Sequence, residues 1–235
     1  DIQTGELRHF HQLDGSCKIA HVPRDGLIVS SREWGLDLYD DETLVKSGRI
    51  HLPWFEAAVS GYGLTIRDGV YIGRSDDVTC ILGGFTHDLF ASCVVVGCRL
   101  GGLHIVNVKQ RTIARTISLP PIPLLPVHGS NDLKNLALAA SGLQVVVTRE
   151  RHLYVVDLCP NEHAYQHFYL QRDPDCVCFL GDTRVAYSHG ADITIYDFAS
   201  DEWVHHFYLR AAHFPTRCAF QSNSDCVVVA CREDE

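Results

Sequence analysis

Short runs of apolar and β-branched residues, separated by turn residues, dominate the chain. GLIVSS (26–31), SCVVVG (92–97), LQVVVT (143–148) and DITIYD (192–197) are typical. Gly, Asp, Asn or Ser flank these runs and favour tight turns. No stretch places apolar residues at i, i+3, i+4 and i+7 over three turns, as an amphipathic helix requires. The pattern therefore predicts an all-β protein.

Four of these runs align as copies of one unit. Each ends in an acid or an amide, used here as an anchor: Asp40, Asn107, Asp157 and Asp197. Apolar residues recur two and four positions before each anchor, and a small residue recurs nine positions before it. A leucine follows about twelve positions later, and another short apolar run precedes each unit. The repeat predicts four antiparallel strands per unit.

The anchor spacing indicates the architecture. With Asp1 counted as the first anchor, the intervals are 39, 67, 50 and 40 residues. Four-stranded units of about 40–45 residues are typical of β-propeller blades. The interval of 50 contains a proline-rich loop, residues 120–132. The interval of 67 contains residues 53–86, for which we favour a compact blade over a long insertion, because structureless loops beyond about 15 residues are uncommon.

The aligned segments also resemble a known family. SREWGLDLYD (31–40), CRLGGLHIVN (98–107), RERHLYVVD (149–157) and HGADITIYD (189–197) are similar to the central and outer strands of WD-repeat β-propellers. They depart from that family in two ways. Tyr39, Val106, Val156 and Tyr196 stand where its namesake tryptophan is found, and the Gly-His pair that opens its repeats is missing.

The resemblance implies one β-propeller domain over residues 1–235, with six or seven blades in the intact ring and an incomplete blade at each end. An incomplete ring would leave backbone groups unpaired at its open edges. We therefore expect the chain to be part of a longer protein or of a complex that completes the ring.

One repeat position carries a row of basic residues. Eight residues before each anchor, or at the matching place in the last repeat, lie Arg32, Arg99, Arg149, His189 and Arg232. Equivalent positions of a propeller lie on one face around the central channel, and arginine is suited to bidentate recognition of carboxylate or phosphate. The resemblance implies binding of acidic or phosphorylated peptides, as in substrate-recognition subunits of ubiquitin ligases. Alternatively, each arginine pairs with an acid of its own turn, such as Glu33, Glu150 or Glu233, and serves structure.

Other residue patterns give weaker evidence, for metal binding or for catalysis. The chain has 10 cysteines and 14 histidines, but no CxxC and no finger-type spacing. Cys93 and Cys98 in CVVVGC are separated by an odd number of residues, so one regular strand directs them to opposite faces. Ser188, His189 and Asp192 suggest a catalytic trio, but Ser188 is the small residue of the repeat. The sequence thus indicates no catalytic residue, no metal ligand and no cofactor.

Charge and hydropathy narrow the function further. The net charge of −9 argues against a nucleic-acid-binding surface, and no apolar run approaches the ~18 residues of a membrane span. Cysteines within apolar strands indicate a reducing compartment, the cytoplasm or nucleus. We therefore predict a non-enzymatic protein-interaction scaffold. The alternatives are a propeller enzyme of hydrolase or lyase type and a purely architectural subunit of a large assembly.

Overall fold

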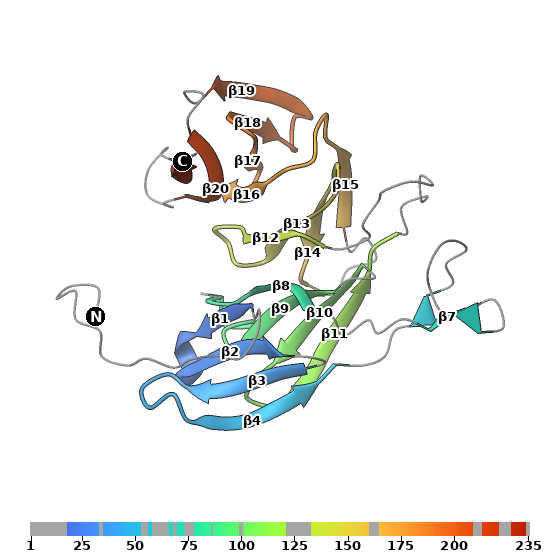
Figure 1. Ribbon diagram of the computed structural model, residues 1–235, viewed down its shortest axis with the longest axis vertical. Coiled ribbons are helices and arrows are strands. Elements are labelled where there is room, and N and C mark those ends of the chain that lie inside the picture. The colour runs from blue at the N-terminus through green and yellow to red at the C-terminus, as the bar shows by residue number, and fades with distance from the viewer. Residues whose placement is uncertain are drawn as a thin grey trace.

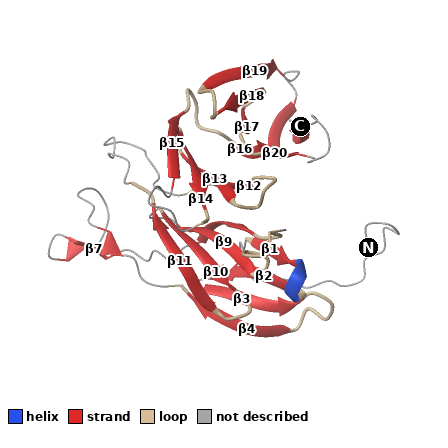
Figure 2. Cartoon of the chain, turned by 180° about the vertical axis from the view of Figure 1, so that it is seen from behind, coloured by secondary structure: helices blue, strands red, loops and turns tan. Residues whose placement is uncertain are grey.

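The computed structural model describes residues 18–32, 35–52, 56–57, 66–67, 70–72, 78–85, 87–98, 101–120, 133–159, 165–208, 213–220 and 227–233. For residues 30–32, 56–57, 66–67, 70–72, 213–220 and 227–233 the description covers the backbone alone. The regular secondary structure of these parts is strand, apart from one short 3₁₀ turn, η1 (Pro23–Asp25) (Figure 2). No helix among them is long and apolar enough to cross a bilayer.

Sixteen of the strands form four antiparallel sheets of four strands each, in chain order. The first sheet contains β1 (Ile19–Val22), β2 (Leu27–Arg32), β3 (Gly35–Asp40) and β4 (Lys46–His51). The second contains β8 (Val78–Leu82), β9 (Cys93–Cys98), β10 (Gly102–Asn107) and β11 (Thr112–Ser118). The third contains β12 (Asn135–Leu138), β13 (Gln144–Arg149), β14 (His152–Asp157) and β15 (Tyr165–Tyr169). The fourth contains β16 (Cys176–Leu180), β17 (Arg184–His189), β18 (Asp192–Asp197) and β19 (Glu202–Tyr208).

The sheets are arranged side by side in chain order (Figure 1). The first strand of each sheet contacts the first strand of the next, from β1 through β8 and β12 to β16. The strand β20 (His213–Phe220) continues this series against β16 and pairs with β21 (Val227–Glu233). The repeated sheets are consistent with propeller blades, but the described residues form no closed ring.

Hydrophobic cores fill the spaces between adjacent sheets, because the middle strands bury both of their faces. The six residues of β9 are all buried, and alternate side chains contact different sheets. Val94, Val96 and Cys98 pack against the first sheet, whereas Cys93 and Val95 pack against the third. Alternation along a strand produces this division. The prediction that Cys93 and Cys98 lie on opposite faces is thereby confirmed.

The anchor residues of the repeat have a structural explanation. Each ends the third strand of its sheet, and its side chain accepts a backbone N–H from the following turn. The acceptors and donors are Asp40 with Thr43 (2.7 Å), Asn107 with Gln110 (2.8 Å), Asp157 with Cys159 (2.8 Å) and Asp197 with Ala199 (3.0 Å). Asp and Asn are the residues suited to such turns. The hydrogen bonds from Thr43 also lower the pKa of Asp40.

The turns after three anchors share a finer geometry. Four residues beyond each of these anchors, Leu44, Arg111 and Asp201 adopt a left-handed backbone with φ of 56°, 57° and 57°. The third strand shifts register with the outer strand just before the anchor in the same three sheets. A left-handed residue and a bulge are typical of this hairpin class. The repeat inferred from the sequence is therefore also a repeat of backbone geometry.

The interpretation of residues 53–86 as a separate blade is wrong. Residues 78–82 are β8, the first strand of the second sheet, and β8 lies directly against β1. One hydrophobic core joins the first two sheets, so no blade lies between them. The described parts of the intervening segment are β5 (Glu56–Ala57), β6 (Ile66–Arg67) and β7 (Val70–Ile72), which form a small three-stranded sheet of their own. The segment is an insertion.

Candidate functional site

The described members of the basic row lie at or near the end of the second strand of their sheets. Arg149 pairs in register with His152, His189 with Asp192, and the backbone of Arg32 with that of Gly35. The backbone of Arg232 pairs with Phe214 in the last hairpin. Arg99 lies outside the described residues, as do the side chains of Arg32 and Arg232. The described side chains of the row are therefore those of Arg149 and His189.

Arg149 is buried, with 1% of its surface exposed. Its Nη2 donates a hydrogen bond of 2.7 Å to the carbonyl oxygen of Pro120, where the proline-rich loop begins. The guanidinium carbon lies 5.7 Å from the centre of the Tyr154 ring, within cation–π range. Burial lowers the pKa of Arg149. This arginine thus joins the third sheet to the start of the loop and does not present its charge on an open face.

Aromatic and imidazole rings surround the same arginine. His152 Nδ1 and His167 Nε2 are 2.7 Å apart, and their rings are stacked at 5.0 Å. The ring of Tyr154 stacks on His167 at 4.8 Å. Burial lowers the pKa of His167, and the charge of Arg149 lowers it further. Burial likewise lowers the pKa of His152, together with its neighbours His167 and Arg149. These rings fill the space beside Arg149 and cover its side chain.

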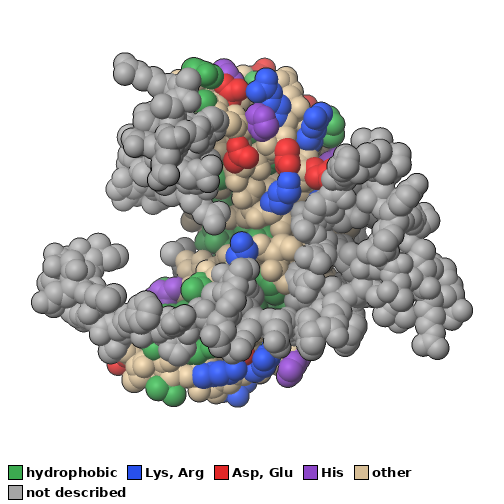
Figure 3. Space-filling view, viewed as in Figure 1, with side chains coloured by type: hydrophobic (Ala, Val, Ile, Leu, Met, Phe, Trp, Pro, Cys, Tyr) green, Lys and Arg blue, Asp and Glu red, His purple; other side chains and the backbone are tan. Residues whose placement is uncertain are grey.

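The other described member of the row, His189, lies beside an open pocket on the fourth sheet. We refer to it as the fourth-sheet pocket, with a volume of about 400 Å³. It is lined by Gln171, Arg172, Tyr187, His189, Asp192, Thr194, Trp203, His205 and His206. In the space-filling view, acidic, basic and histidine side chains gather at the top, over the fourth sheet (Figure 3).

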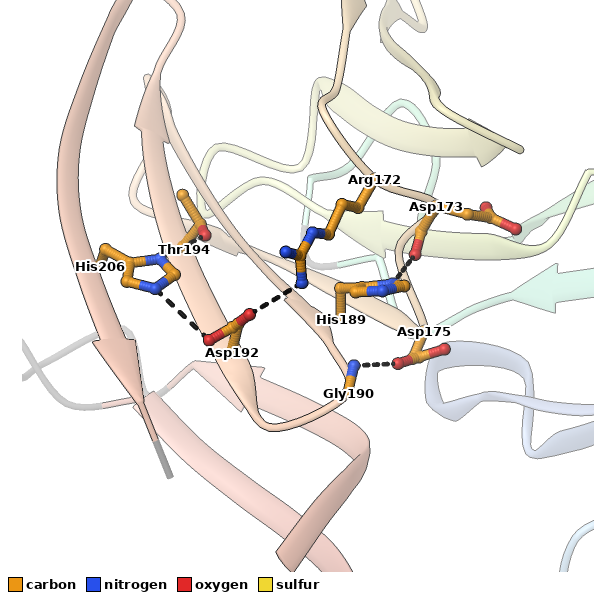
Figure 4. A network of polar contacts seen from close by, with 8 residues as sticks. All are labelled: Arg172, Asp173, Asp175, His189, Gly190, Asp192, Thr194 and His206. Atoms are coloured by element: carbon orange, nitrogen blue, oxygen red, sulfur yellow. Dashed lines mark hydrogen bonds and ion pairs between the residues drawn. The ribbon is translucent and has the colours of Figure 1, made fainter. Parts of the chain in front are cut away.

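Asp192 is the centre of the polar contacts in this pocket (Figure 4). One carboxylate oxygen lies 3.2 Å from Nη1 of Arg172, and the other lies 3.4 Å from Nε2 of His206. The opposite ring nitrogen of His206 lies 3.2 Å from the hydroxyl of Thr194. His189 contacts the carbonyl oxygen of Asp173 through Nδ1 at 2.7 Å. One arginine and one aspartate thus supply the permanent charges of the pocket lining.

Aromatic rings form another wall of the pocket. Trp203 on the outer strand packs against Tyr187 at 6.0 Å and against Tyr196 at 4.7 Å between ring centres. Both tyrosines are buried, whereas Trp203 is 45% exposed. Burial raises the pKa of Tyr187, and the hydrogen bond from Thr194 and the charge of Arg172 act in the opposite direction. The pocket therefore combines a carboxylate with exposed and buried aromatic surface.

The pocket and the ring cluster of the third sheet occupy equivalent positions. His189 corresponds to Arg149 by strand register, and Asp192 corresponds to His152. In the same way His206, opposite Thr194, corresponds to His167, opposite Tyr154. Sequence reasoning missed Arg172, Asp192, Trp203 and His206 as a group. Alternation along a strand puts Asp192 and Thr194 on the same face. Their partners on β19 cannot be read from the sequence, because the register shifts between Ile195 and Tyr196.

The suggested catalytic trio is not assembled. Ser188 is 1% exposed, and its hydroxyl lies 2.9 Å from the thiol sulfur of Cys176. His189 follows it directly and contacts Asp173. Neighbouring residues of a strand project to opposite faces, so Ser188 and His189 do not converge. The packing role expected of Ser188 as the small residue of the repeat agrees with its burial.

A second pocket, of about 510 Å³, lies where the first strands of the four sheets meet. It is lined by Lys18, Ile19, Thr79, Cys80, Ile81, Lys134, Asn135, Leu136, Cys176 and Val177. Nothing in the described part of the chain groups three or more His, Cys, Asp or Glu residues as a metal site would require.

The fold defines an all-β protein built from repeated four-stranded antiparallel sheets. Comparison of the sequence with protein-family models gives no match. Comparison with curated proteins gives no significant match.

Proposed function

We propose that this protein is a non-enzymatic protein-interaction module that binds a peptide segment of another protein at the fourth-sheet pocket. The observation that supports this most directly is the open pocket beside an outer strand rich in exposed aromatic residues. Trp203, Phe207 and Tyr208 on β19 are 45%, 49% and 69% exposed. Tyrosine and tryptophan are enriched among the residues that dominate binding energy at protein interfaces. Of these three residues Trp203 lines the pocket itself, and a pocket with fixed polar groups beside an exposed aromatic strand fits a bound peptide.

Acidic or phosphorylated segments remain the ligand expected for the basic row. Arg149 is committed to the carbonyl of Pro120, so in this proposal Arg32, Arg99 and Arg232 would supply the charge. The double charge reversal Arg32→Glu and Arg99→Glu tests this part. Loss of binding to phosphorylated peptides in the double variant, with a normal fold, would support it. Unchanged binding would refute it.

A peptide library tests the main proposal. The intact protein is applied to an array of random and charged peptides, and the peptides it retains are measured in solution by fluorescence anisotropy. Tyr208→Ser is expected to weaken binding of the retained peptides, because the exposed Tyr208 is paired in register with Asp192, which lines the pocket. Leu89→Ser is the matched control, since Leu89 is equally exposed at 68% but lies in the turn between β8 and β9, away from the fourth sheet. If the protein retains no peptide, or if both variants lose binding equally, the proposal fails and the architectural alternative gains support.

A further inference from the structure

The geometry points to a positively charged side chain, Lys or Arg from a basic segment of a partner protein, as the ligand of the fourth-sheet pocket. We propose that this side chain replaces Arg172 on the carboxylate of Asp192. The inference rests on the proposed function, peptide binding at this pocket, and adds the chemistry of the ligand.

The two charges of this ion pair are anchored unequally. Asp192 begins the strand β18, and its side chain is 21% exposed. Arg172 lies in the connection between β15 and β16, and its side chain is 62% exposed. Exposed ion pairs contribute only about 0–1 kcal/mol. Rotation of the Arg172 side chain into solvent is therefore inexpensive, whereas displacement of Asp192 would require movement of the sheet.

The surface next to Asp192 also suits a cation. Tyr187 and Trp203 offer aromatic surface beside the carboxylate, and Tyr208 lies opposite Asp192 across the strands. Aromatic faces attract ammonium and guanidinium groups, and the attraction increases when the cation loses water. The position of Arg172 in the lining shows that a guanidinium fits against this carboxylate. A ligand arginine or lysine would find the same partners.

The sequence around the pocket is acidic. Residues 171–208 contain seven acidic residues but two arginines, so this part of the chain accounts for −5 of the net −9. The acidic residues are Asp173, Asp175, Asp182, Asp192, Asp197, Asp201 and Glu202. A surface with one dominant sign of charge speeds the association of partners of the opposite sign. Asp173 is paired with Lys134 and Asp197 with Arg184, so the negative charge that favours a basic segment comes from the other acids of this range.

An anionic ligand fits the same pocket poorly. Its charge would approach the fixed carboxylate of Asp192, and Arg172 would have to leave that carboxylate to meet it. The anion would then be bound outside the pocket, with Asp192 unpaired nearby. Like charges brought together at an interface are unfavourable by several kcal/mol. The same residues thus discriminate between the two signs of ligand charge.

Two substitutions with opposite expected effects test the inference. Asp192→Asn keeps the size of the side chain and removes its charge, and it should weaken binding of an arginine-containing peptide by about tenfold or more. Arg172→Gln removes the side chain that competes for Asp192, and it should increase the affinity for the same peptide by about two- to fivefold. Glu202→Gln is the matched control, because it removes one negative charge from β19 outside the pocket lining. It should change binding less than twofold at 150 mM salt, where exposed charges are screened.

The probes are four peptides that differ at one central residue: Arg, Lys, Gln and phosphoserine. Binding is followed by fluorescence anisotropy, and thermal unfolding confirms that each variant is folded. The inference is supported if the protein binds the Arg and Lys peptides best, if Asp192→Asn weakens that binding and if Arg172→Gln strengthens it. Binding that prefers phosphoserine, weakens in Arg172→Gln and strengthens in Asp192→Asn overturns the inference but leaves peptide binding intact. Failure of all four peptides, together with an empty library screen, overturns the proposed function itself.

Discussion

His104 provides a test of the packing between the first two sheets, because it is a titratable group buried in a mostly apolar place. It lies on β10 with none of its surface exposed, opposite Val96 of the core. Its Nδ1 lies 2.9 Å from the hydroxyl of Thr116. Within the described part of the chain, its Nε2 has no hydrogen-bond partner. Burial lowers the pKa of His104 to about 4, against an ordinary value of 6.5.

The direction in which the stability changes with pH follows from the pKa of His104 in the folded protein and its ordinary pKa. Between pH 6.5 and pH 4 the unfolded chain binds a proton at this histidine, whereas the folded protein excludes it. The free energy of unfolding therefore falls as the pH is lowered through this window. With these values, His104 alone lowers it by about 2 kcal/mol at pH 5 and about 3 kcal/mol at pH 4, relative to pH 7.5.

The measurement is a pair of urea titrations, of the protein and of His104→Leu, at several pH values from 7.5 to 4. Leucine cannot titrate, and it fills the site of the imidazole with an apolar side chain. Carboxylates contribute to both curves and cancel in the difference. The value at pH 7.5 gives the effect of packing, and the further change toward acid gives the effect of titration. Parallel curves would show that His104 binds a proton as easily in the folded protein as in the unfolded chain, and would refute the reasoning.

Three further substitutions test other parts of the structure. Arg149→Lys keeps the charge but cannot reproduce both the bond to Pro120 and the cover over Tyr154, and it should lower the free energy of unfolding by about 1–3 kcal/mol in urea. Gly97→Ala would place a Cβ atom 2.4 Å from the sulfur of Cys80; it should cost about 1–3 kcal/mol, and Cys80→Ala should restore most of that loss. Thr194→Tyr should fill the fourth-sheet pocket and abolish peptide binding while the melting temperature is maintained. Normal stability of Arg149→Lys would contradict the role of the Arg149 contacts, and normal stability of Gly97→Ala would contradict the close approach to Cys80. Retained peptide binding in Thr194→Tyr would show that peptides do not bind in the pocket.

Much of the fold was predictable because one local requirement recurs. The turn after each third strand needs a side chain that accepts a backbone N–H, so Asp or Asn returns at the same place in each sheet, as Asp40 and Asn107 do. That signal is local and survives in a single sequence. The insertion at 53–77 was misassigned because its short strands resemble those of a blade. Its status depends on the contact between β1 and β8, which lies outside the segment.

The site was less predictable, because burial of an arginine depends on its neighbours. Arg149 and His189 share one repeat position, yet the first is closed in and the second lines a pocket. The space for Arg149 requires Gly101 of the adjacent sheet, where a Cβ atom would lie 2.8 Å from a guanidinium nitrogen. Gly101 also has a φ of 83°, which suits glycine. Nothing in the local sequence around Arg149 indicates this contact.

One repeat position shows how similar sheets acquire different chemistry. Three residues before each anchor lie Asp37, His104, Tyr154 and Thr194. Each is paired in register with a polar residue of the outer strand: Arg49, Thr116, His167 and His206. The first three are almost fully buried, whereas Thr194 lines a pocket. In the third sheet the ring of Tyr154 stacks on His167 and fills the space between strands. Threonine at the same place has no ring, so His206 and Asp192 stay accessible. The closed cluster and the pocket thus differ at three equivalent positions, Arg149 and His189, His152 and Asp192, and Tyr154 and Thr194. At the third of these, the ring of Tyr154 fills space that Thr194 leaves open.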